Sequence, residues 1–315
     1  MDYFVVHEGE KPLLELCRAL SGGTRRQLGA IDNLLFATHG VVHTNRVRPV
    51  LDLNELPTPD FDGLPLDEYN ETGRRPLLGS RGCYWAKCRF CSYVTVDPVY
   101  RTRDIGLVVD DMAKLRQQGA RHISFADSAL SPPRMKALAE GLIKTRGRLS
   151  WDGFVRFEKA FLGLTLPLAA RAGFEMAFWG LETGSQKMQV MIDKCVDLAI
   201  AKRVLATAHR AGIYNRMMVM YGFPGETLDD FLETYNFLQD NANHFSAISL
   251  TRYAPESATQ LGCDLLRLGE AEPLGDLSLG LSYPTRDLSG WESLVDNIRL
   301  LNARIVHRGM ERHGS

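Results

Sequence analysis

Short apolar runs alternate with helical patterns along most of this 315-residue chain, from residue 76 onward. Six runs have the length of a strand, and four longer stretches place apolar residues three and four positions apart, as one face of a helix does. The runs cover residues 77–79, 122–126, 150–155, 174–179, 216–221 and 245–251, and the helical stretches cover residues 105–118, 134–144, 196–210 and 228–239. This alternation predicts an α/β fold in which helices cover a parallel sheet.

Such a sheet is either open and doubly wound or curled into a barrel, and periodicity alone does not distinguish the two. In both arrangements the reactive groups gather at the carboxyl ends of the strands. The residues that follow each predicted strand are therefore the candidates for a functional site.

The first strand is followed by Cys83, Cys88 and Cys91, three cysteines within nine residues. Three thiolates on a compact loop can each bind one iron of a four-iron cluster, which leaves the fourth iron open for another ligand. A structural zinc site would need four protein ligands, and no other Cys or His lies nearby in the sequence to complete the set. The remaining cysteines are scattered, and we interpret them as small buried hydrophobes. The cluster therefore predicts iron–sulfur chemistry.

Composition excludes several other classes of protein. Hydrophobic residues make up 45% of the chain, charged residues make up 24%, and the formal net charge is −1. Such a chain can bury a core without disulfides, and its charge attracts neither nucleic acid nor a membrane surface. No apolar run approaches the length of a membrane span, and the N-terminus lacks the pattern of a signal peptide. We therefore expect a cytoplasmic protein, with no nucleic acid and no membrane as partner.

At the cysteines the sequence resembles the radical S-adenosylmethionine (SAM) superfamily, and the resemblance extends from about residue 77 to residue 251. The usual spacing in that family is C-x3-C-x2-C, with an aromatic residue before the last cysteine. Phe90 occupies the aromatic position, whereas four residues instead of three separate Cys83 from Cys88. The form Cys-Tyr-Trp-x-Lys-Cys-x-Phe-Cys is similar to one branch of the superfamily, and the extra residue removes no ligand.

The resemblance implies a partial (β/α)6 TIM-like barrel and a radical enzyme of methyltransferase or oxidoreductase type. It implies that the amine and carboxylate of SAM chelate the open iron of a [4Fe-4S] cluster. An electron passed through the cluster then cleaves SAM into methionine and a 5′-deoxyadenosyl radical, which abstracts hydrogen from a small-molecule or peptide substrate. The implied electron donor is a flavodoxin or ferredoxin, and the sequence does not identify the substrate.

The resemblance also implies contacts to SAM at the ends of later strands. Asp127 matches an acidic residue that receives the amino group of SAM, and a helix N-cap is the alternative for this residue. Residues 180–185 resemble the Gly-x-Glu-Ser-Gly-Ser element of the family, which places Glu182 and Ser185 at the ribose or carboxylate of SAM. Lys194 matches a basic residue of this branch, with an ordinary surface lysine as the alternative.

Two further segments belong to this expected SAM site. Gly222, Phe223 and Pro224 match a Gly-x-Pro-Gly-Glu-Thr element that lies along the adenine ring in the family, and Thr227 is expected to begin the next helix. Arg156 ends the third strand. If Arg156 points into the barrel, it is a ligand of the SAM carboxylate or of the substrate, and the alternation of side chains does not settle its direction.

Residues 1–70 differ from the rest: they predict a strand, a helix, a hairpin around residues 39–40 and a proline-rich linker at residues 56–61. This segment resembles the last βα unit and exit strap of a cobalamin-binding domain, most of which is missing. We therefore expect cobalamin only in a longer form of the chain; the alternative is descent from a cobalamin-dependent methyltransferase that now works without it. We expect residues 71–260 to form the radical SAM core and residues 261–315 to form an extension whose amphipathic helix, over residues 291–305, closes the open side of the barrel.

Two other functions remain as alternatives to a radical SAM enzyme that also transfers a methyl group. One is a catalytically silent iron–sulfur or zinc-binding module that retains the fold. The other is a methylthiotransferase-like enzyme, which would need a second three-cysteine cluster and commonly a nucleic-acid-binding appendage, and the sequence contains neither.

Overall fold

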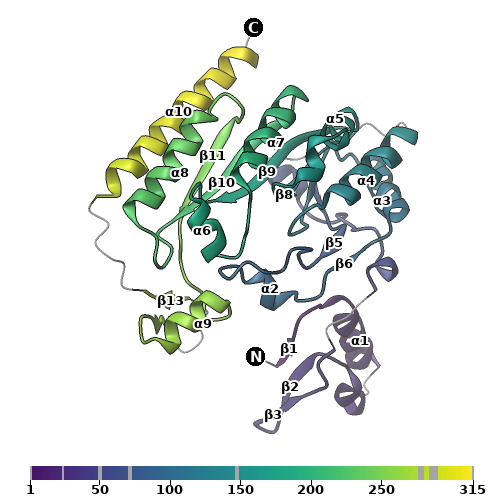
Figure 1. Cartoon of the computed structure of the whole chain (residues 1–315). Coiled ribbons are helices and arrows are strands. Elements are labelled where there is room, and N and C mark those ends of the chain that lie inside the picture. Colours follow the sequence, from purple (N-terminus) through teal and green to yellow (C-terminus); the bar gives the residue numbers. More distant parts are fainter. Residues whose placement is uncertain are drawn as a thin grey trace. The chain divides into compact units, whose positions relative to one another are not determined.

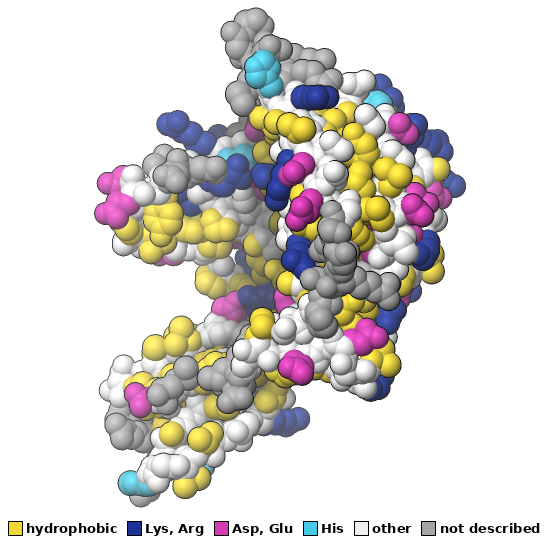
Figure 2. Space-filling view, turned by 90° about the vertical axis from the view of Figure 1, so that its left-hand side faces the viewer, with side chains coloured by type: hydrophobic (Ala, Val, Ile, Leu, Met, Phe, Trp, Pro, Cys, Tyr) yellow, Lys and Arg dark blue, Asp and Glu magenta, His cyan; other side chains and the backbone are white. Residues whose placement is uncertain are grey.

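The computed structural model describes residues 2–22, 25–48, 52–69, 73–145, 149–275, 280–283 and 290–313, without the side chains of residues 25, 26 and 308–313. The chain divides into two compact units, Met1–Pro57 and Thr58–Ser315. None of the described helices is both long enough and apolar enough to cross a membrane. Figure 2 shows charged side chains of both signs interspersed with apolar ones over the face that it presents.

The N-terminal unit is a small α/β fold. Strands β1 (Tyr3–Val5), β2 (Leu34–Thr38) and β3 (Val41–Thr44) form an antiparallel sheet in that order, and helix α1 (Glu10–Ser21) follows β1. The predicted hairpin is confirmed, since His39 and Gly40 adopt left-handed conformations between β2 and β3. Short 3-10 helices lie at Arg25–Ala30 and Leu53–Glu55. Five residues form the apolar cluster of this unit: Leu16, Ala19, Leu28, Ile31 and Leu34.

The second unit is built on a six-stranded sheet in which every neighbouring pair is parallel. Its order is β11-β10-β9-β8-β7-β4, which follows the order of the chain without a reversal. The strands are β4 (Arg74–Leu77), β7 (His122–Phe125), β8 (Ser150–Val155), β9 (Phe174–Glu182), β10 (Tyr214–Tyr221) and β11 (Ala247–Arg252). A sheet wound in one direction keeps its helices on one face, so this is a partial barrel and not a doubly wound sheet. The barrel is not closed, because β4 and β11 are its edges.

Helices cover the outer face of this sheet (Figure 1). They are α3 (Ile105–Gln117), α4 (Pro132–Lys144), α5 (Thr165–Arg171), α7 (Leu198–Arg210) and α8 (Leu228–Asp240). The short helix α6 (Gln186–Met191) packs instead with Phe223, Tyr253 and Leu261, and 3-10 helices lie at Leu66–Glu68 and Lys159–Leu162. The four predicted helices are confirmed, whereas α5 was not predicted because seven residues are too few to show a helical period. Thr227 caps α8 in a reciprocal pair with Asp230, as its position predicted.

The alternation of side chains along the strands separates the core from the barrel interior. Ile123, Trp151, Val155, Trp179 and Met217 point outward and are buried against the helices. Their sequence neighbours therefore point into the barrel. Two strand ends differ from prediction by more than one residue: β4 ends at Leu77, and β9 continues through Glu182.

The C-terminal part contains α9 (Gln260–Arg267), the short strands β12 (Glu272–Pro273) and β13 (Leu281–Ser282), and α10 (Glu292–His313). Helix α10 packs against β11 and α8 (Figure 1). The side-chain oxygen of Asn302 in α10 accepts the backbone N–H of Ile248 in the edge strand β11 at 2.7 Å. The helix thus covers this edge of the sheet and satisfies one of its unpaired donors.

Candidate active site

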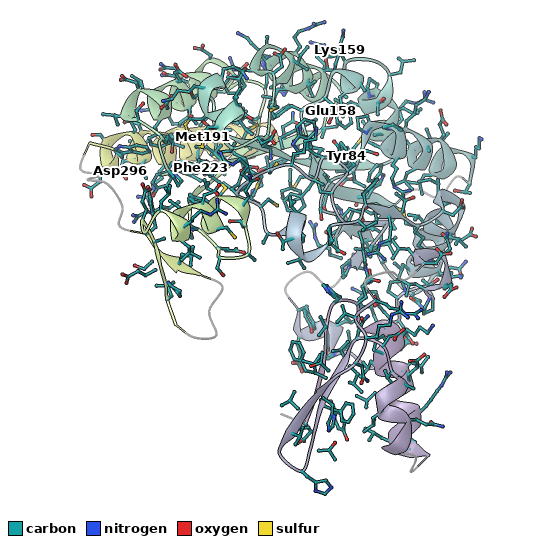
Figure 3. The ribbon with its side chains drawn as sticks, turned by 60° about the horizontal axis from the view of Figure 1, so that its bottom comes forward. Tyr84, Glu158, Lys159, Met191, Phe223 and Asp296 are labelled. Atoms are coloured by element: carbon teal, nitrogen blue, oxygen red, sulfur yellow. The ribbon has the colours of Figure 1, made fainter. Side chains whose placement is uncertain are left out.

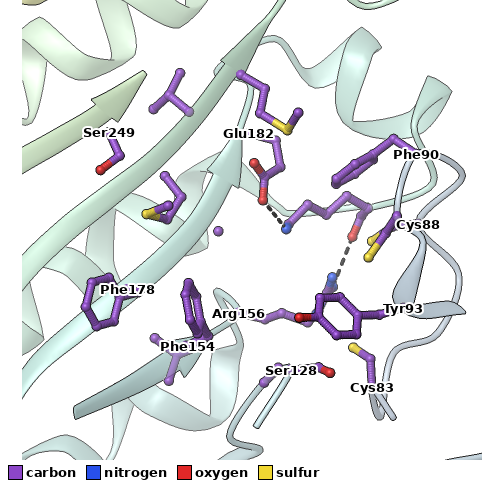
Figure 4. Close-up of a pocket in the computed structure, with 18 of the residues that line it drawn as sticks. Cys83, Cys88, Phe90, Tyr93, Ser128, Phe154, Arg156, Phe178, Glu182 and Ser249 are labelled. Carbon is purple, nitrogen blue, oxygen red and sulfur yellow. Dashed lines mark hydrogen bonds and ion pairs between the residues drawn. The ribbon is translucent and has the colours of Figure 1, made fainter. Parts of the chain in front are cut away.

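A cavity of about 300 Å³ lies at the carboxyl ends of β8 to β11, beside the cysteine loop (Figure 4). Cys83, Cys88 and Cys91 all line it, together with Arg156, Glu182 and Lys194. The three cysteines and these three charged side chains come from four segments between residues 83 and 194. The fold therefore brings the predicted ligand set and part of the predicted SAM site to one place.

The loop that carries the cysteines is bounded by the two-stranded antiparallel ladder of β5 (Ser80–Arg81) and β6 (Arg101–Thr102), and it includes the short helix α2 (Tyr93–Val96). Gly82 has a φ of +73°, and a Cβ at this position would lie 2.8 Å from the carbonyl oxygen of Val99. Only glycine fits such a close backbone approach. Cys91 N–H donates to the carbonyl of Cys88 at 3.2 Å, which forms a tight turn between the last two cysteines.

Burial strongly influences the cysteine thiols. It raises the pKa of Cys88 to about 11, although the charges of Lys194 and Arg156 act in the opposite direction. Burial also raises the pKa of Cys91. Thiolates in this cavity therefore need an additional positive charge, which a bound metal would supply. No group of three His, Cys, Asp or Glu side chains within the described ranges is arranged to hold a single metal ion.

The residues between Cys83 and Cys88 make specific tertiary contacts. The Tyr84 hydroxyl donates to Oε1 of Glu158 at 3.2 Å, and the two residues lie close together in Figure 3. The indole N–H of Trp85 donates to the carbonyl of Asp193 at 2.9 Å. Ala86 adopts a left-handed conformation with a φ of +48°. Tyr84 and Trp85 thus anchor the loop to the segment that follows β8 and to the segment that contains Lys194.

Arg89 fastens the other half of the loop. Its backbone N–H donates to Ile192 and its guanidinium donates to the carbonyl of Met191, both at 3.0 Å. The same guanidinium forms an ion pair with Asp264 of α9 at 2.8 Å. Phe90 then packs with its ring centroid 5.5 Å from that of Phe223. The loop is therefore held from α6 and from α9.

Arg156 points into the cavity, which settles the direction that sequence alternation left open. Its guanidinium lies 4.0 Å from the ring centroid of Trp85, and its Nη2 donates to the carbonyl of Lys194 at 3.0 Å. Its Nη1 is buried and has no hydrogen-bond partner within the part of the chain that the structure describes. A buried donor without a partner is costly, and a carboxylate in the cavity would satisfy it.

Glu182 and Lys194 form a buried ion pair beside Arg156. Lys194 Nζ lies 2.7 Å from Glu182 Oε1, and Lys194 is only 7% exposed, so the surface-lysine alternative is wrong. Glu182 has a φ of +62°, which turns its side chain at the very end of β9. Gly180 leaves the room for this pair, since a Cβ there would lie 2.6 Å from Lys194 Nζ.

Gln189 is a buried residue that the sequence did not single out. Its side-chain N–H groups donate to the carbonyls of Leu181 and Thr183, each at 2.7 Å, and these two residues flank Glu182. Its Oε1 accepts the N–H of Val196, and its carbonyl accepts the N–H of Lys194. Gln189 thereby positions both members of the ion pair, although it does not line the cavity.

Asp127 occupies a different place from the one expected. Its carboxylate accepts hydrogen bonds from the backbone N–H of Gly79 at 2.7 Å and from the Ser80 hydroxyl, and it is 1% exposed. It caps no helix and does not line the cavity, whereas its neighbour Ser128 does. Burial raises the pKa of Asp127 against these hydrogen bonds. Asp127 thus joins the end of β7 to the start of the cysteine loop.

Ser185 is also turned away from the cavity. It is fully buried, and its hydroxyl donates to Asp230 of α8 at 3.0 Å. Burial alone would raise the pKa of Asp230, but hydrogen bonds from Lys187, Thr227 and Ser185 outweigh it and lower the pKa to about 2. Ser185 therefore acts in the packing of α6 against α8.

Gly222, Phe223 and Pro224 lie next to the cavity but do not line it. The backbone N–H groups of Gly222 and Phe223 donate to Oε2 of Glu226 at 2.6 and 3.0 Å. Phe223 belongs to an apolar cluster with Met191, which lies close to it in Figure 3, and with Phe90. Glu226 thus holds the turn at residues 222–226 together. Phe90, which packs against Phe223, connects this turn to the cavity.

The cysteines outside the loop differ from the sequence-based interpretation. Cys17, Cys195 and Cys263 are exposed and not buried. Cysteines are usually buried, so this placement was not expected from residue type alone. The three thiols of the loop are half-buried and line the cavity together.

The sequence profile of the radical SAM superfamily matches residues 77–238, and the chain belongs to that superfamily of enzymes. An uncharacterized methyltransferase of Pyrococcus horikoshii is 28% identical over 244 residues, which cover 75% of this chain and 52% of that protein. The bacteriochlorophyllide d C-12(1)-methyltransferase of Chlorobaculum tepidum is 28% identical over 182 residues, which cover 56% of this chain and 39% of that protein. The chain thus spans about half or less of the length of these curated relatives.

Solved structures share the fold. The radical SAM methyltransferase TsrM of Kitasatospora setae, with tryptophan and a SAM analogue bound, superposes with a TM-score of 0.74 at 19% identity, covering 95% of this chain and 67% of TsrM. The cobalamin-dependent radical SAM enzyme OxsB, with aqua-cobalamin bound, gives a TM-score of 0.72 at 19% identity, covering 90% of this chain and 48% of OxsB. The expected partial barrel, similar to the core of cobalamin-dependent relatives, is confirmed.

Proposed function

We propose that this chain cleaves SAM reductively at a [4Fe-4S] cluster held by Cys83, Cys88 and Cys91, and that it abstracts hydrogen from a substrate that the sequence does not identify. One observation carries the proposal: the three thiols share a cavity with a buried guanidinium N–H of Arg156 that has no hydrogen-bond partner among the described residues. Three cysteines suit a cluster with one open iron, and the guanidinium suits a carboxylate that binds beside it.

The side chains around the thiols have separate tasks. Arg156 Nη1 donates to the carboxylate of SAM, while its Nη2 remains on the carbonyl of Lys194. Glu182 accepts a hydrogen bond from a ribose hydroxyl, and Lys194, whose Nζ lies 2.7 Å from Glu182 Oε1, orients the Glu182 side chain. When bound, the cluster and SAM supply a 5′-deoxyadenosyl radical for hydrogen abstraction. The protein excludes water and positions one C–H bond.

Methyl transfer is the proposed outcome of this chemistry. Two curated relatives carry the name of a methyltransferase, and TsrM shares the fold. We propose that cobalamin, where it takes part, binds only in a longer form of the chain, because the N-terminal unit lacks the Asp-x-His-x-x-Gly loop. Cobalamin quantified after anaerobic reconstitution tests this: stoichiometric binding to residues 1–315 would contradict it.

The remaining partners follow from the same chemistry. A flavodoxin or ferredoxin donates the electron, and the substrate is a small molecule or a peptide. The cytoplasm is the proposed compartment, since a reduced environment preserves unpaired thiols.

The first experiment is anaerobic reconstitution with iron and sulfide, followed by SAM and dithionite and detection of 5′-deoxyadenosine. The wild-type chain should produce 5′-deoxyadenosine, and Cys88→Ala should not. Cys17→Ala is the matched control, because Cys17 is exposed and lies in the N-terminal unit. A reconstituted cluster without 5′-deoxyadenosine would instead favour the alternative of a catalytically silent iron–sulfur module.

A further inference from the structure

The cavity has two chemically different ends (Figure 4). Among the described residues that line it, the charged side chains are Arg156, Glu182 and Lys194, and these lie toward the thiols. The other end is formed by Phe154, Phe178 and Ser249, which Figure 4 labels on the side away from the thiols, and by Met218, the register partner of Ser249. An apolar end with a few polar groups is the usual form of a site that orients a small organic molecule.

Phe154 and Phe178 form the wall of the uncharged end. They are register partners on β8 and β9, with ring centroids 5.0 Å apart and planes tilted by 31°. Phe154 is 43% exposed, although its neighbour Val155, on the opposite face of the strand, is 2% exposed. A phenylalanine on an inner strand that keeps this much surface uncovered is suited to stack against a flat ring.

Two further strands complete this end. Met218 of β10 presents a thioether, which packs favourably against aromatic rings. On β11 the Ser249 hydroxyl accepts a hydrogen bond from Nε of Arg216 at 2.8 Å. Since a hydroxyl has one proton and two lone pairs, the proton and the second lone pair of Ser249 are available to a polar atom at the edge of a ring.

We propose that this end of the cavity binds a flat, uncharged aromatic ring of the substrate, with the Ser249 hydroxyl forming a hydrogen bond to a polar atom at its edge. The inference rests on the proposed function for the chemistry at the thiol end, and it adds the class of substrate. A ring held by Phe154, Phe178 and Met218 lies in the same cavity as Cys83, Cys88 and Cys91. It is therefore positioned for hydrogen abstraction on or beside the ring.

Indole is the probe, and its binding to the full chain is measured by ligand-observed saturation-transfer NMR. Indole should bind the wild-type chain, and Phe154→Leu, which keeps an apolar side chain but removes the ring, should weaken binding at least tenfold. Phe4→Leu is the matched control, since Phe4 is 51% exposed and lies in the N-terminal unit. Absence of indole binding, or equal weakening by both variants, would overturn the inference.

The adenine of SAM is a second source of a flat ring, and competition distinguishes it from substrate. Indole should bind equally well to the reconstituted chain with and without saturating SAM. Displacement of indole by SAM would overturn the inference and assign the uncharged end to adenine. Wild-type production of 5′-deoxyadenosine without indole binding would refute the substrate class alone. Indole binding without any 5′-deoxyadenosine would refute the proposed function and leave the ring site standing.

Discussion

Lys194 places its ammonium nitrogen 2.7 Å from Oε1 of Glu182, and the two side chains are only 8% and 11% exposed. Twelve residues separate them in the chain, and α6 with the following turn returns Lys194 to the end of β9. A buried pair of this kind is weak evidence for stability, because removing two charges from water is costly. Its position in the wall of the thiol cavity instead favours a role in binding.

Gly180→Ala tests whether the Glu182–Lys194 ion pair needs the space that Gly180 leaves open. The added Cβ would lie 2.6 Å from Lys194 Nζ and 3.0 Å from Glu182 Oε1, so the ion pair must move. We expect about tenfold weaker SAM binding by calorimetry, equivalent to about 1.4 kcal/mol, with little change in melting temperature because flexible side-chain ends can shift. Gly9→Ala is the control, since nothing lies within 4 Å of its Cβ position. Unchanged SAM affinity in Gly180→Ala would show that the pair does not position the ligand.

Gln189→Ala removes the residue that holds the backbone on both sides of Glu182. The variant removes the Gln189 donors from the carbonyls of Leu181 and Thr183, although the Leu181 carbonyl still accepts the N–H of Thr183. We expect a loss of roughly 2–4 kcal/mol in the free energy of unfolding in urea, together with weaker SAM binding. Gln186→Ala is the matched control, because Gln186 is exposed and makes longer hydrogen bonds, at 3.2 and 3.4 Å. Equal losses in the two variants would contradict a special role for Gln189.

Trp85→Leu tests the support of Arg156 by the cysteine loop. The indole ring lies 4.0 Å below the guanidinium, and cation–π contacts of this kind are worth roughly 0.5–1 kcal/mol or more. We expect three- to tenfold weaker SAM binding in Trp85→Leu. Trp85→Phe keeps an aromatic face but loses the hydrogen bond to Asp193, so its effect should be smaller. A leucine variant that binds SAM as tightly as the wild-type chain would rule out this support.

Glu226→Gln should change how stability depends on pH. Burial raises the pKa of Glu226 from 4.5 to about 7 against the hydrogen bonds from Phe223 and Gly222, and its Oε1 has no hydrogen-bond partner among the described residues. Between these two pKa values the folded protein keeps a proton that the unfolded chain has released, so stability falls as pH rises from about 4.5 to about 7. Above about pH 7 the full loss of stability from ionising the buried Glu226 carboxyl is present.

Glu226→Gln has no carboxyl to ionise, so it does not lose stability in this way as the pH rises. We expect Glu226→Gln to exceed the wild-type chain by about 1–3 kcal/mol in free energy of unfolding at pH 8, and by clearly less at pH 5. Urea unfolding at the two pH values measures the difference. Glu233→Gln, at an exposed position on α8, the helix that follows Glu226, is the surface control. A gap of the same size at pH 5 and pH 8 would refute the titration of Glu226.

Most of the fold could be predicted because the signals are local. The spacing of apolar residues predicted the six strands of the sheet, and Thr227 marked the start of α8 through its capping position. Helix α5 was missed, since a single short segment carries no period. The boundary of β9 was missed because Gly180 usually interrupts a strand, whereas here it makes room for the Glu182–Lys194 pair.

The candidate site was only partly predictable, because matching a motif does not determine where a side chain points. Asp127 and Ser185 stand at the expected strand ends, yet Asp127 accepts from Gly79 and Ser80, and Ser185 donates to Asp230. The sequence held no signal for Gln189, whose contacts all go to backbone groups. Backbone partners leave no pattern of residue types from which such a role can be predicted.

The sequence by itself determined the class of fold and singled out three cysteines as candidate cluster ligands, because periodicity and ligand spacing are properties of neighbouring residues. The tertiary structure alone decided that Arg156 points inward, that Lys194 meets Glu182, and that Phe154 and Phe178 form an uncharged end opposite the thiols. Strand alternation divides side chains between two faces, but only the curvature of the sheet makes one face an interior. Contacts between distant segments depend on that curvature, so they follow from the folded chain and not from local spacing.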